Sequence, residues 1–229
     1  MKIWEETTTQ WGLKLSDHQK RQLEIYYELL REWNQKMNLT AIVDKENVYL
    51  KHFLDSLSLT QLVVFQDQSL LDVGSGAGFP GLPLKIVFPN LRLSLVEATQ
   101  KRTYFMQEVV NACGLENVEV VHSRIEDFKA IDHYDIVTAR AVAPLPILLE
   151  WCLPYVKVGG SFIAMKGPNL QEERKLSEHI LNLLGAELKE TKHFKLGDYE
   201  RTLLLYQKAK LNPQGYPRPY GKLKKLYRG

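Results

Sequence analysis

Residues 70–86 read LLDVGSGAGFPGLPLKI, and this segment limits the possible folds more than any other part of the chain. A short apolar strand is expected over 69–73, followed by a loop with glycine at positions 74, 76 and 78 and by a helix that begins near Pro80. Closely spaced glycines let a loop turn sharply and approach a ligand without Cβ clashes. The next helix directs free N–H groups and a positive dipole end toward that ligand. The segment therefore predicts a binding turn between a strand and a helix.

An acidic residue ends the next expected strand. That strand covers 91–96, and the carboxylate of Glu97 after it can accept hydrogen bonds from two ribose hydroxyls. The dinucleotide fingerprint requires a small residue where this chain has the bulky Phe79. Asp72, two residues before the glycines, instead resembles motif I of class I S-adenosylmethionine-dependent methyltransferases, because a carboxylate suits the cationic groups of that cofactor. The alternative is that the glycines serve only the shape of a tight turn.

Strands and helices alternate from residue 69 onward. Strands are expected near 69–73, 92–96, 118–121, 134–139 and 160–165, and helices near 80–88, 99–113, 145–154 and 169–184. Two further strands, over 187–194 and 201–207, are joined by a turn at Gly197-Asp198. This pattern predicts an α/β fold with a doubly wound, mostly parallel, seven-stranded Rossmann-like sheet, the class I methyltransferase fold, whose last strand is antiparallel. Ligands are then expected at the carboxyl ends of the strands.

Three segments are expected along the 229 residues. Residues 1–65 form an N-terminal helical cap, 66–208 the S-adenosylmethionine-binding methyltransferase domain, and 209–229 a basic C-terminal tail. Apolar residues at three- and four-residue spacing predict cap helices over 16–37 and 46–64. Ser16 and Gln19 are placed for a capping box at the start of the first.

Composition places the chain among ordinary globular proteins, with 45% hydrophobic and 25% charged residues. No apolar run approaches the roughly 20 residues that a membrane span needs, and the first residues lack a signal-peptide pattern. We therefore expect a cytoplasmic protein without a membrane partner. Cys113 and Cys152 have no metal-like spacing and no neighbouring histidine, so we expect reduced core thiols and no metal.

The positive charge is concentrated at the end of the chain. All 27 acidic residues lie at or before Glu200, whereas the last 29 residues hold eight Lys or Arg and no acid. Those cations are Arg201, Lys208, Lys210, Arg218, Lys222, Lys224, Lys225 and Arg228. Tyr216, Tyr220 and Tyr227 stand among them, a combination that suits a polyanion whose bases can be stacked upon. We expect the tail to hold RNA and to contribute little to cofactor binding; the alternative is a solvated, disordered end.

The fourth strand ends in Thr138-Ala139-Arg140-Ala141, where substrate meets cofactor in folds of this type. Methyltransferases that act on exocyclic amines resemble one another in an Asp/Asn-Pro-Pro-aromatic turn here, and cytosine-C5 enzymes need a Pro-Cys pair; neither is present. N7 of guanine has a lone pair and no proton to lose, so its methylation needs alignment rather than a base. Arg140 can read the neighbouring O6 edge and is the candidate catalytic residue. The alternative is a structural ion pair.

The remaining candidates lie near strand ends. Phe79 could pack on the cofactor or cap the helix against the sheet, and Ile125-Glu126 follow the third strand, near the expected adenine. The candidate substrate-binding residues are His52, Lys101, Arg102, Arg124, Lys166 and Arg218. His52 and Asp55 share a helical face, so they could meet each other or a common ligand, and a structural hydrogen bond is the preferred interpretation.

Several motifs occur in the order and spacing of one family. They are Asn38-Leu-Thr-Ala-Ile, Lys51-His-Phe-Leu-Asp-Ser-Leu, Asp72-Val-Gly-Ser-Gly-Ala-Gly-Phe-Pro-Gly, Lys101-Arg102, Asp135-Ile-Val-Thr-Ala-Arg-Ala and Tyr216-Pro-Arg. In these the chain resembles the glucose-inhibited division protein B family, also called ribosomal RNA small-subunit methyltransferase G. The resemblance covers nearly the whole chain, but the segment after Tyr216-Pro-Arg departs from the family's usual ending.

The resemblance implies methyl transfer from S-adenosylmethionine to N7 of a guanine in 16S ribosomal RNA near the decoding centre. It also implies cofactor contacts at Gly74, Phe79, Ile125, Glu126 and Arg140. With the residues argued from the loop, the predicted cofactor site comprises Asp72, Gly74, Gly76, Gly78, Phe79, Glu97, Ile125, Glu126 and Arg140. We expect 16S ribosomal RNA or the small ribosomal subunit as partner and a monomeric enzyme. The alternatives are a non-catalytic RNA-binding protein that retains the fold, and a nicotinamide-dependent dehydrogenase.

Overall fold

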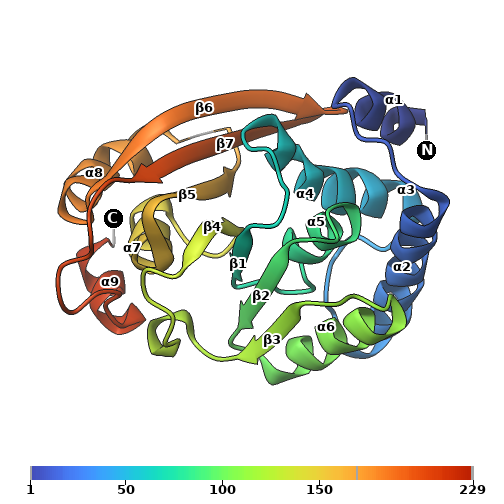
Figure 1. Cartoon of the computed structure of the whole chain (residues 1–229), viewed down its shortest axis with the longest axis horizontal. Coiled ribbons are helices and arrows are strands. Elements are labelled where there is room, and N and C mark those ends of the chain that lie inside the picture. Colours follow the sequence, from blue (N-terminus) through green and yellow to red (C-terminus); the bar gives the residue numbers. More distant parts are fainter. Residues whose placement is uncertain (1, 169, 228–229) are drawn as a thin grey trace.

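A computed structural model describes residues 2–168 and 170–227 of the chain. Asn169, at the start of one expected helix, and Arg228 of the basic tail lie outside the described residues. Within them, seven strands form one sheet in the order β3-β2-β1-β4-β5-β7-β6 (Figure 1). The strands are β1 (Ser69–Val73), β2 (Arg92–Glu97), β3 (Val118–His122), β4 (Tyr134–Arg140), β5 (Val156–Lys166), β6 (Ala186–Leu196) and β7 (Tyr199–Lys208).

The strand pairing confirms the expected sheet. β1 is parallel to β2 and β4, β2 is parallel to β3, and β4 is parallel to β5. β7 is antiparallel to both of its neighbours, β5 and β6. The order in which strands are added to the sheet reverses between β1 and β4. In open α/β sheets, ligands bind in the crevice at such a reversal. The carboxyl ends of β1, β2 and β4 are therefore where a site is expected.

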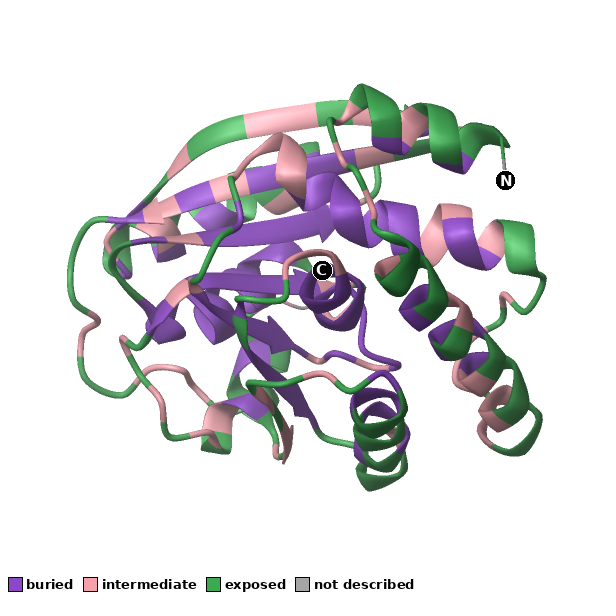
Figure 2. Ribbon diagram, turned by 45° about the vertical axis from the view of Figure 1, so that its right-hand side comes forward, coloured by how far each residue is buried: buried purple, intermediate pink, exposed green. Residues whose placement is uncertain are grey.

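Helices cover both faces of the sheet, so the central strands are buried on both sides. Leu70 of β1 packs into the core cluster that contains α5 (Gly81–Val87) and α6 (Gln100–Ala112). Leu71, the next residue, points into the cluster that contains α7 (Leu145–Cys152) and α8 (Gln171–Leu183). All five residues of β1 are buried, and Figure 2 shows buried strands between helices whose outer faces are exposed.

The N-terminal helices cover the α5 and α6 side. They are α1 (Lys2–Gln10), α2 (Asp17–Met37), α3 (Lys45–Val48) and α4 (Asp55–Leu57). The expected capping box is confirmed: Ser16 Oγ accepts the Gln19 N–H at 3.2 Å, and Gln19 Oε1 accepts the Ser16 N–H at 2.8 Å.

The helix expected over 46–64 is interrupted. A π-helical turn, Tyr49–Leu54, separates α3 from α4, and a 3₁₀ turn, Ser58–Gln61, ends the segment. A π-helical turn changes which side chains face the sheet and often marks a functional site. Here it carries Lys51 and His52 toward the end of β4.

The described part of the tail folds back onto the body. It ends in α9 (Tyr220–Leu226), which lies beside α7 (Figure 1). Leu223 of α9 is fully buried, and the ring of Tyr220 lies 5.4 Å from that of Trp151 in α7. Within 209–227, Leu223 and Tyr220 therefore contact the body of the protein, whereas most of the other residues are exposed.

Candidate active site

Two positions of the loop between β1 and α5 require glycine. A Cβ atom would clash there, and the backbone φ is positive. Gly74, Gly76 and Gly78 have φ of +66°, +60° and +92°. A Cβ on Gly78 would lie 2.3 Å from Leu82 Cδ1, and a Cβ on Gly74 would lie 2.8 Å from Val142 Cγ2. The loop can therefore take this shape only with glycine at positions 74 and 78.

Two carboxylates hold this loop in place. Asp72 Oδ2 accepts the N–H of Gly81 at 2.8 Å, so it fixes the start of α5. Glu97 Oε2 accepts the N–H of Gly76 at 2.9 Å, and its Oε1 accepts the N–H of Thr99 at 2.8 Å. Asp72 thus bonds to the backbone of the loop, whereas ribose binding by Glu97 stays a prediction.

Asp72 has an unusual environment for an acid. Its side chain is fully buried, and its Oδ1 atom has no hydrogen-bond partner among the described residues. Burial raises its pKa to about 7, although the Gly81 N–H and the charge of Arg140 oppose the shift. Because the Oδ1 atom is enclosed by protein, contact between Asp72 and the cofactor stays a prediction.

A cavity of about 300 Å³ opens beside the loop, at the carboxyl ends of β1, β2 and β3. Four of the predicted cofactor residues line it: Gly74, Glu97, Ile125 and Glu126. Its size is at the lower end of the range of about 300–1,000 Å³ that is typical of ligand sites. The other five predicted cofactor residues, Asp72, Gly76, Gly78, Phe79 and Arg140, do not line it.

Phe79 faces away from this cavity and into the core. Its ring stacks between those of Tyr26, at 5.4 Å and 18°, and His52, at 4.6 Å and 25°. The guanidinium carbon of Arg140 lies 4.9 Å from the centre of the Phe79 ring. Because these groups contact the Phe79 ring, Phe79 packs against the helical cap in this structure.

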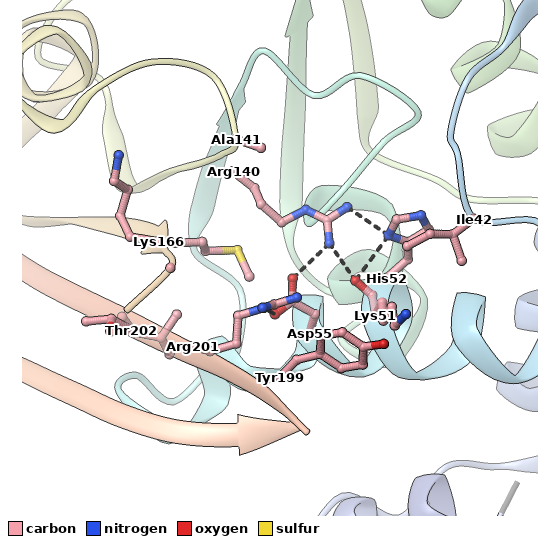
Figure 3. Close-up of a pocket in the computed structure, with 13 residues that line it drawn as sticks. Ile42, Lys51, His52, Asp55, Arg140, Ala141, Lys166, Tyr199, Arg201 and Thr202 are labelled. Atoms are coloured by element: carbon pink, nitrogen blue, oxygen red, sulfur yellow. Dashed lines mark hydrogen bonds and ion pairs between the residues drawn. The ribbon is translucent and has the colours of Figure 1, made fainter. Parts of the chain in front are cut away.

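A second cavity, of about 560 Å³, lies on the other side of the β4 carboxyl end (Figure 3). Arg140 lines this cavity, and residues of the N-terminal helical cap hold its side chain in place. Its Nη1 donates to Asp55 Oδ2 at 2.9 Å and to the Lys51 carbonyl at 3.1 Å, and its Nη2 lies 3.4 Å from His52 Nδ1. Asp55 Oδ1 also accepts from Arg201 Nε at 2.9 Å, so one buried carboxylate bridges two arginines.

His52 is uncharged at neutral pH in this setting. Burial and the nearby positive charge of Arg140 lower its pKa to about 3. Its Nε2 lies 2.8 Å from the Thr40 hydroxyl oxygen, so both ring nitrogens have neighbours. His52 and Asp55 do not bond to each other; each contacts Arg140.

The two cavities share Ala141, the residue after Arg140. Ala141 has φ of +57°, and the chain turns there between β4 and α7. The two cavities therefore adjoin at this residue. Two molecules bound one in each cavity would lie on either side of the β4 carboxyl end.

The predicted substrate-binding residues do not form one cluster. His52 and Lys166 line the second cavity, whereas Arg102 and Arg124 line the first. Lys101 is exposed on α6. Lys166 pairs with Glu173 at 2.7 Å, and Arg218 makes two bonds of 2.5 and 2.6 Å to buried Glu150. Their contacts with RNA stay predictions.

Several lining residues were not singled out as site residues from the sequence. Lys51, Tyr199 and Arg201 line the second cavity, and Lys51 Nζ lies 4.0 Å from the centre of the Tyr199 ring. Trp151 and Tyr220 line the first cavity. The Gly197-Asp198 turn predicts a hairpin, but no local pattern shows that this hairpin covers the end of β4.

In residues 2–168 and 170–227, no group of three or more His, Cys, Asp or Glu side chains is arranged to hold a metal ion. Within the same residues, no helix is long and apolar enough to cross a membrane.

The sheet order, the antiparallel β7, the glycine loop after β1 and the acid at the end of β2 define a class I S-adenosylmethionine-dependent methyltransferase. A SAM-dependent methyltransferase from Aquifex aeolicus has the same fold. Its solved structure superposes with a TM-score of 0.55 over 77% of this chain and 97% of that chain, at 21% identity.

Sequence comparison gives the particular family. The sequence model of GidB, described as rRNA small subunit methyltransferase G, matches residues 19–204. The ribosomal RNA small subunit methyltransferase G of Acetivibrio thermocellus is 46% identical over 228 residues, which cover 96% of this chain and 93% of that protein. The protein of the same name from Geobacillus thermodenitrificans is 49% identical over 217 residues, with 92% and 91% covered. The chain belongs to this family, and the resemblance stated from its motifs is confirmed.

Proposed function

We propose that the protein transfers a methyl group from S-adenosylmethionine to N7 of a guanine in 16S ribosomal RNA near the decoding centre. The observation that supports this most directly is the junction at Ala141 of two cavities, one beside the glycine loop and one beside Arg140. The nature of the RNA comes from the family, whose members are named for the small ribosomal subunit.

The chemistry fits the residues at the end of β4. When bound, S-adenosylmethionine supplies an electrophilic methyl group on a sulfonium centre. The N7 lone pair of guanine forms the new N–C bond as the C–S bond breaks, and no proton has to leave. The site needs no general base and no thiolate, and burial raises the pKa of both Cys113 and Cys152. What the protein must supply is alignment.

Arg140 is suited to orient the base. Asp55 and the Lys51 carbonyl hold one end of its guanidinium, so its remaining donors point from a fixed position. A donor directed at guanine O6 would hold the base and leave N7 free to react. The same bonds would be made by an arginine with a purely structural role, so a test has to separate activity from stability.

A transcript with 7-deazaguanosine in place of guanosine provides a sharp test, because its position 7 is a carbon without a lone pair. The purified chain, S-adenosylmethionine and either unmodified or substituted 16S RNA would be incubated, and methylated nucleosides would be identified by mass spectrometry. We expect 7-methylguanosine in the unmodified RNA and no transfer to the substituted RNA. Equal transfer to both would place the methyl group elsewhere and contradict the proposal.

Two matched measurements complete this test. Arg140→Ala should reduce transfer far more than it lowers the melting temperature; a parallel loss of both would assign Arg140 a structural role. Binding of S-adenosylmethionine without transfer to naked RNA, to an assembly intermediate or to the subunit would identify a non-catalytic RNA-binding protein.

We further propose that the enzyme acts as a monomer in the cytoplasm and without a metal. Gel filtration at working concentration tests the oligomeric state, assays with a chelator test the need for a metal, and cell fractionation tests the location. A dimer, or loss of activity with the chelator that added metal restores, would contradict them.

A further inference from the structure

The described end of the chain reaches the cofactor cavity, although the sequence analysis assigned the tail to RNA alone. Tyr220, the first residue of α9, lines the same cavity as Gly74, Glu97 and Ile125. Its backbone N–H lies 3.3 Å from Glu126 Oε1, on the predicted adenine side of that cavity. The residue is 39% exposed, and its ring lies 5.4 Å from the ring of Trp151.

The segment that carries Tyr220 is anchored firmly. Arg218 makes a two-pronged contact with Glu150, a carboxylate that is fully buried in α7. Its guanidinium carbon also lies 5.2 Å from the centre of the Tyr216 ring. Bonding to Glu150 raises the pKa of Arg218 above its usual value, so the guanidinium stays protonated. Undocking the segment would leave a buried carboxylate without a partner, which is strongly unfavourable.

A second contact anchors α9 itself. Leu223 lies one turn after Tyr220 and is fully buried in the cluster that contains α7. Lys222 and Lys225, on the opposite face of α9, are exposed. One face of this short helix is thus committed to the body of the protein, and Tyr220 lies on that face at the rim of the cavity.

The wall beside Tyr220 continues in Trp151, which also lines the cavity. The Trp151 Nε1 atom is itself buried, so its N–H does not face the cavity and offers no donor to a ligand. The pair of aromatic rings, with centres 5.4 Å apart, is the part of this wall that a ligand can contact. Such a pair is a suitable surface for a purine, because every base has a flat face that stacks on aromatic rings.

We propose that the C-terminal segment is part of the cofactor site, with Tyr220 and Trp151 as the wall against which the adenosine of S-adenosylmethionine packs. The Arg218–Glu150 pair then positions Tyr220 from outside the cavity. Removal of residues 208–229 should impair cofactor binding, in contrast to the expectation from sequence.

The test measures binding of S-adenosylhomocysteine and of adenosine to the full chain by calorimetry, without RNA, so its result does not depend on the RNA substrate. Tyr220→Ala should weaken binding of both ligands by about 5- to 100-fold, the usual range for loss of one aromatic–base stack. Tyr220→Phe should retain wild-type affinity. Because Tyr220 is partly exposed, these changes spare the core.

Tyr104→Ala is the matched control, since Tyr104 is an exposed tyrosine of α6 that does not line the cavity. It should leave both affinities unchanged. Unchanged binding in a folded Tyr220→Ala variant would overturn the proposal. Tighter binding would also overturn it, because it would show that the tail blocks the cavity. If methyl transfer fails while the Tyr220 effect on binding is present, only the proposed RNA function is contradicted.

Discussion

Asp55 connects the helical cap to both arginines of the second cavity, and its replacement by asparagine tests how this site is held. The Asp55 side chain is only 4% exposed, and it bonds to Arg140 and Arg201 at 2.9 Å each. Asp55→Asn keeps the size of the side chain and one acceptor oxygen but removes its charge. The two guanidinium groups would then face each other without a carboxylate between them.

The expected cost follows from burial. Removing one partner of a buried ion pair typically destabilises a protein by about 3–5 kcal/mol. The side chains of Arg140 and Arg201 are 16% and 27% exposed, so water screens part of the charge that the substitution leaves uncompensated. We expect Asp55→Asn to lower the free energy of unfolding by about 2–3 kcal/mol.

Urea unfolding of a double-mutant cycle measures the interaction. Asp55→Asn, Arg140→Gln and the double variant should be non-additive by more than about 1 kcal/mol, because removing both partners leaves less uncompensated charge. Asp135→Asn is the control, since Asp135 stands at the opposite end of β4 and contacts Ser69 and Lys157. It should destabilise the fold additively with Arg140→Gln. Additivity of Asp55→Asn with Arg140→Gln, within about 0.5 kcal/mol, would refute the coupling.

Three further predictions concern the cofactor loop. Glu97→Ala should weaken S-adenosylmethionine binding by about 1–3 kcal/mol in calorimetry, because Glu97 lines the cavity and braces Gly76; an unchanged dissociation constant would leave it a surface acid. Gly76→Val should abolish cofactor binding while thermal unfolding shows a loss of only about 1–3 kcal/mol from strained φ, and wild-type binding would disprove the placement of the loop. The free energy of unfolding of the Asp72→Asn variant, measured relative to that of the wild type, should rise by about 2–3 kcal/mol as the pH is raised from 5 to 8. The folded pKa near 7 exceeds the ordinary 3.8, so ionisation of Asp72 destabilises the wild type increasingly up to that pH; parallel pH profiles from urea unfolding would contradict this.

The parts of the fold that depend on local patterns could be predicted from the sequence. The period of apolar residues and the glycine loop indicate β1, α5 and β2, and the capping box marks the start of α2. The π-helical turn at Tyr49–Leu54 could not, because a single smooth helix satisfies the same apolar spacing. α1 has only two large apolar residues, Ile3 and Trp4, and packs through Trp4 onto Tyr49.

The parts of the site that the sequence did not predict depend on contacts between segments that are distant in the chain. Arg140 was identified from its place at the end of β4, but its bonds to Asp55 come from a segment 85 residues away in the chain. A signal for the tail contact was present, since Glu150 stands in an otherwise apolar helix and a buried acid needs a cationic partner. Composition identified the tail as basic but did not indicate that Arg218 is that partner.

The central claim is that methyl donor and base meet at Ala141, and a crystal structure of the complex with S-adenosylhomocysteine tests it most directly. We predict the adenosine in the cavity lined by Glu97, Ile125 and Tyr220, with the sulfur directed at Ala141 and toward the cavity of Arg140. A ligand bound within the Arg140 cavity itself, or one whose sulfur points away from Ala141, would contradict the account.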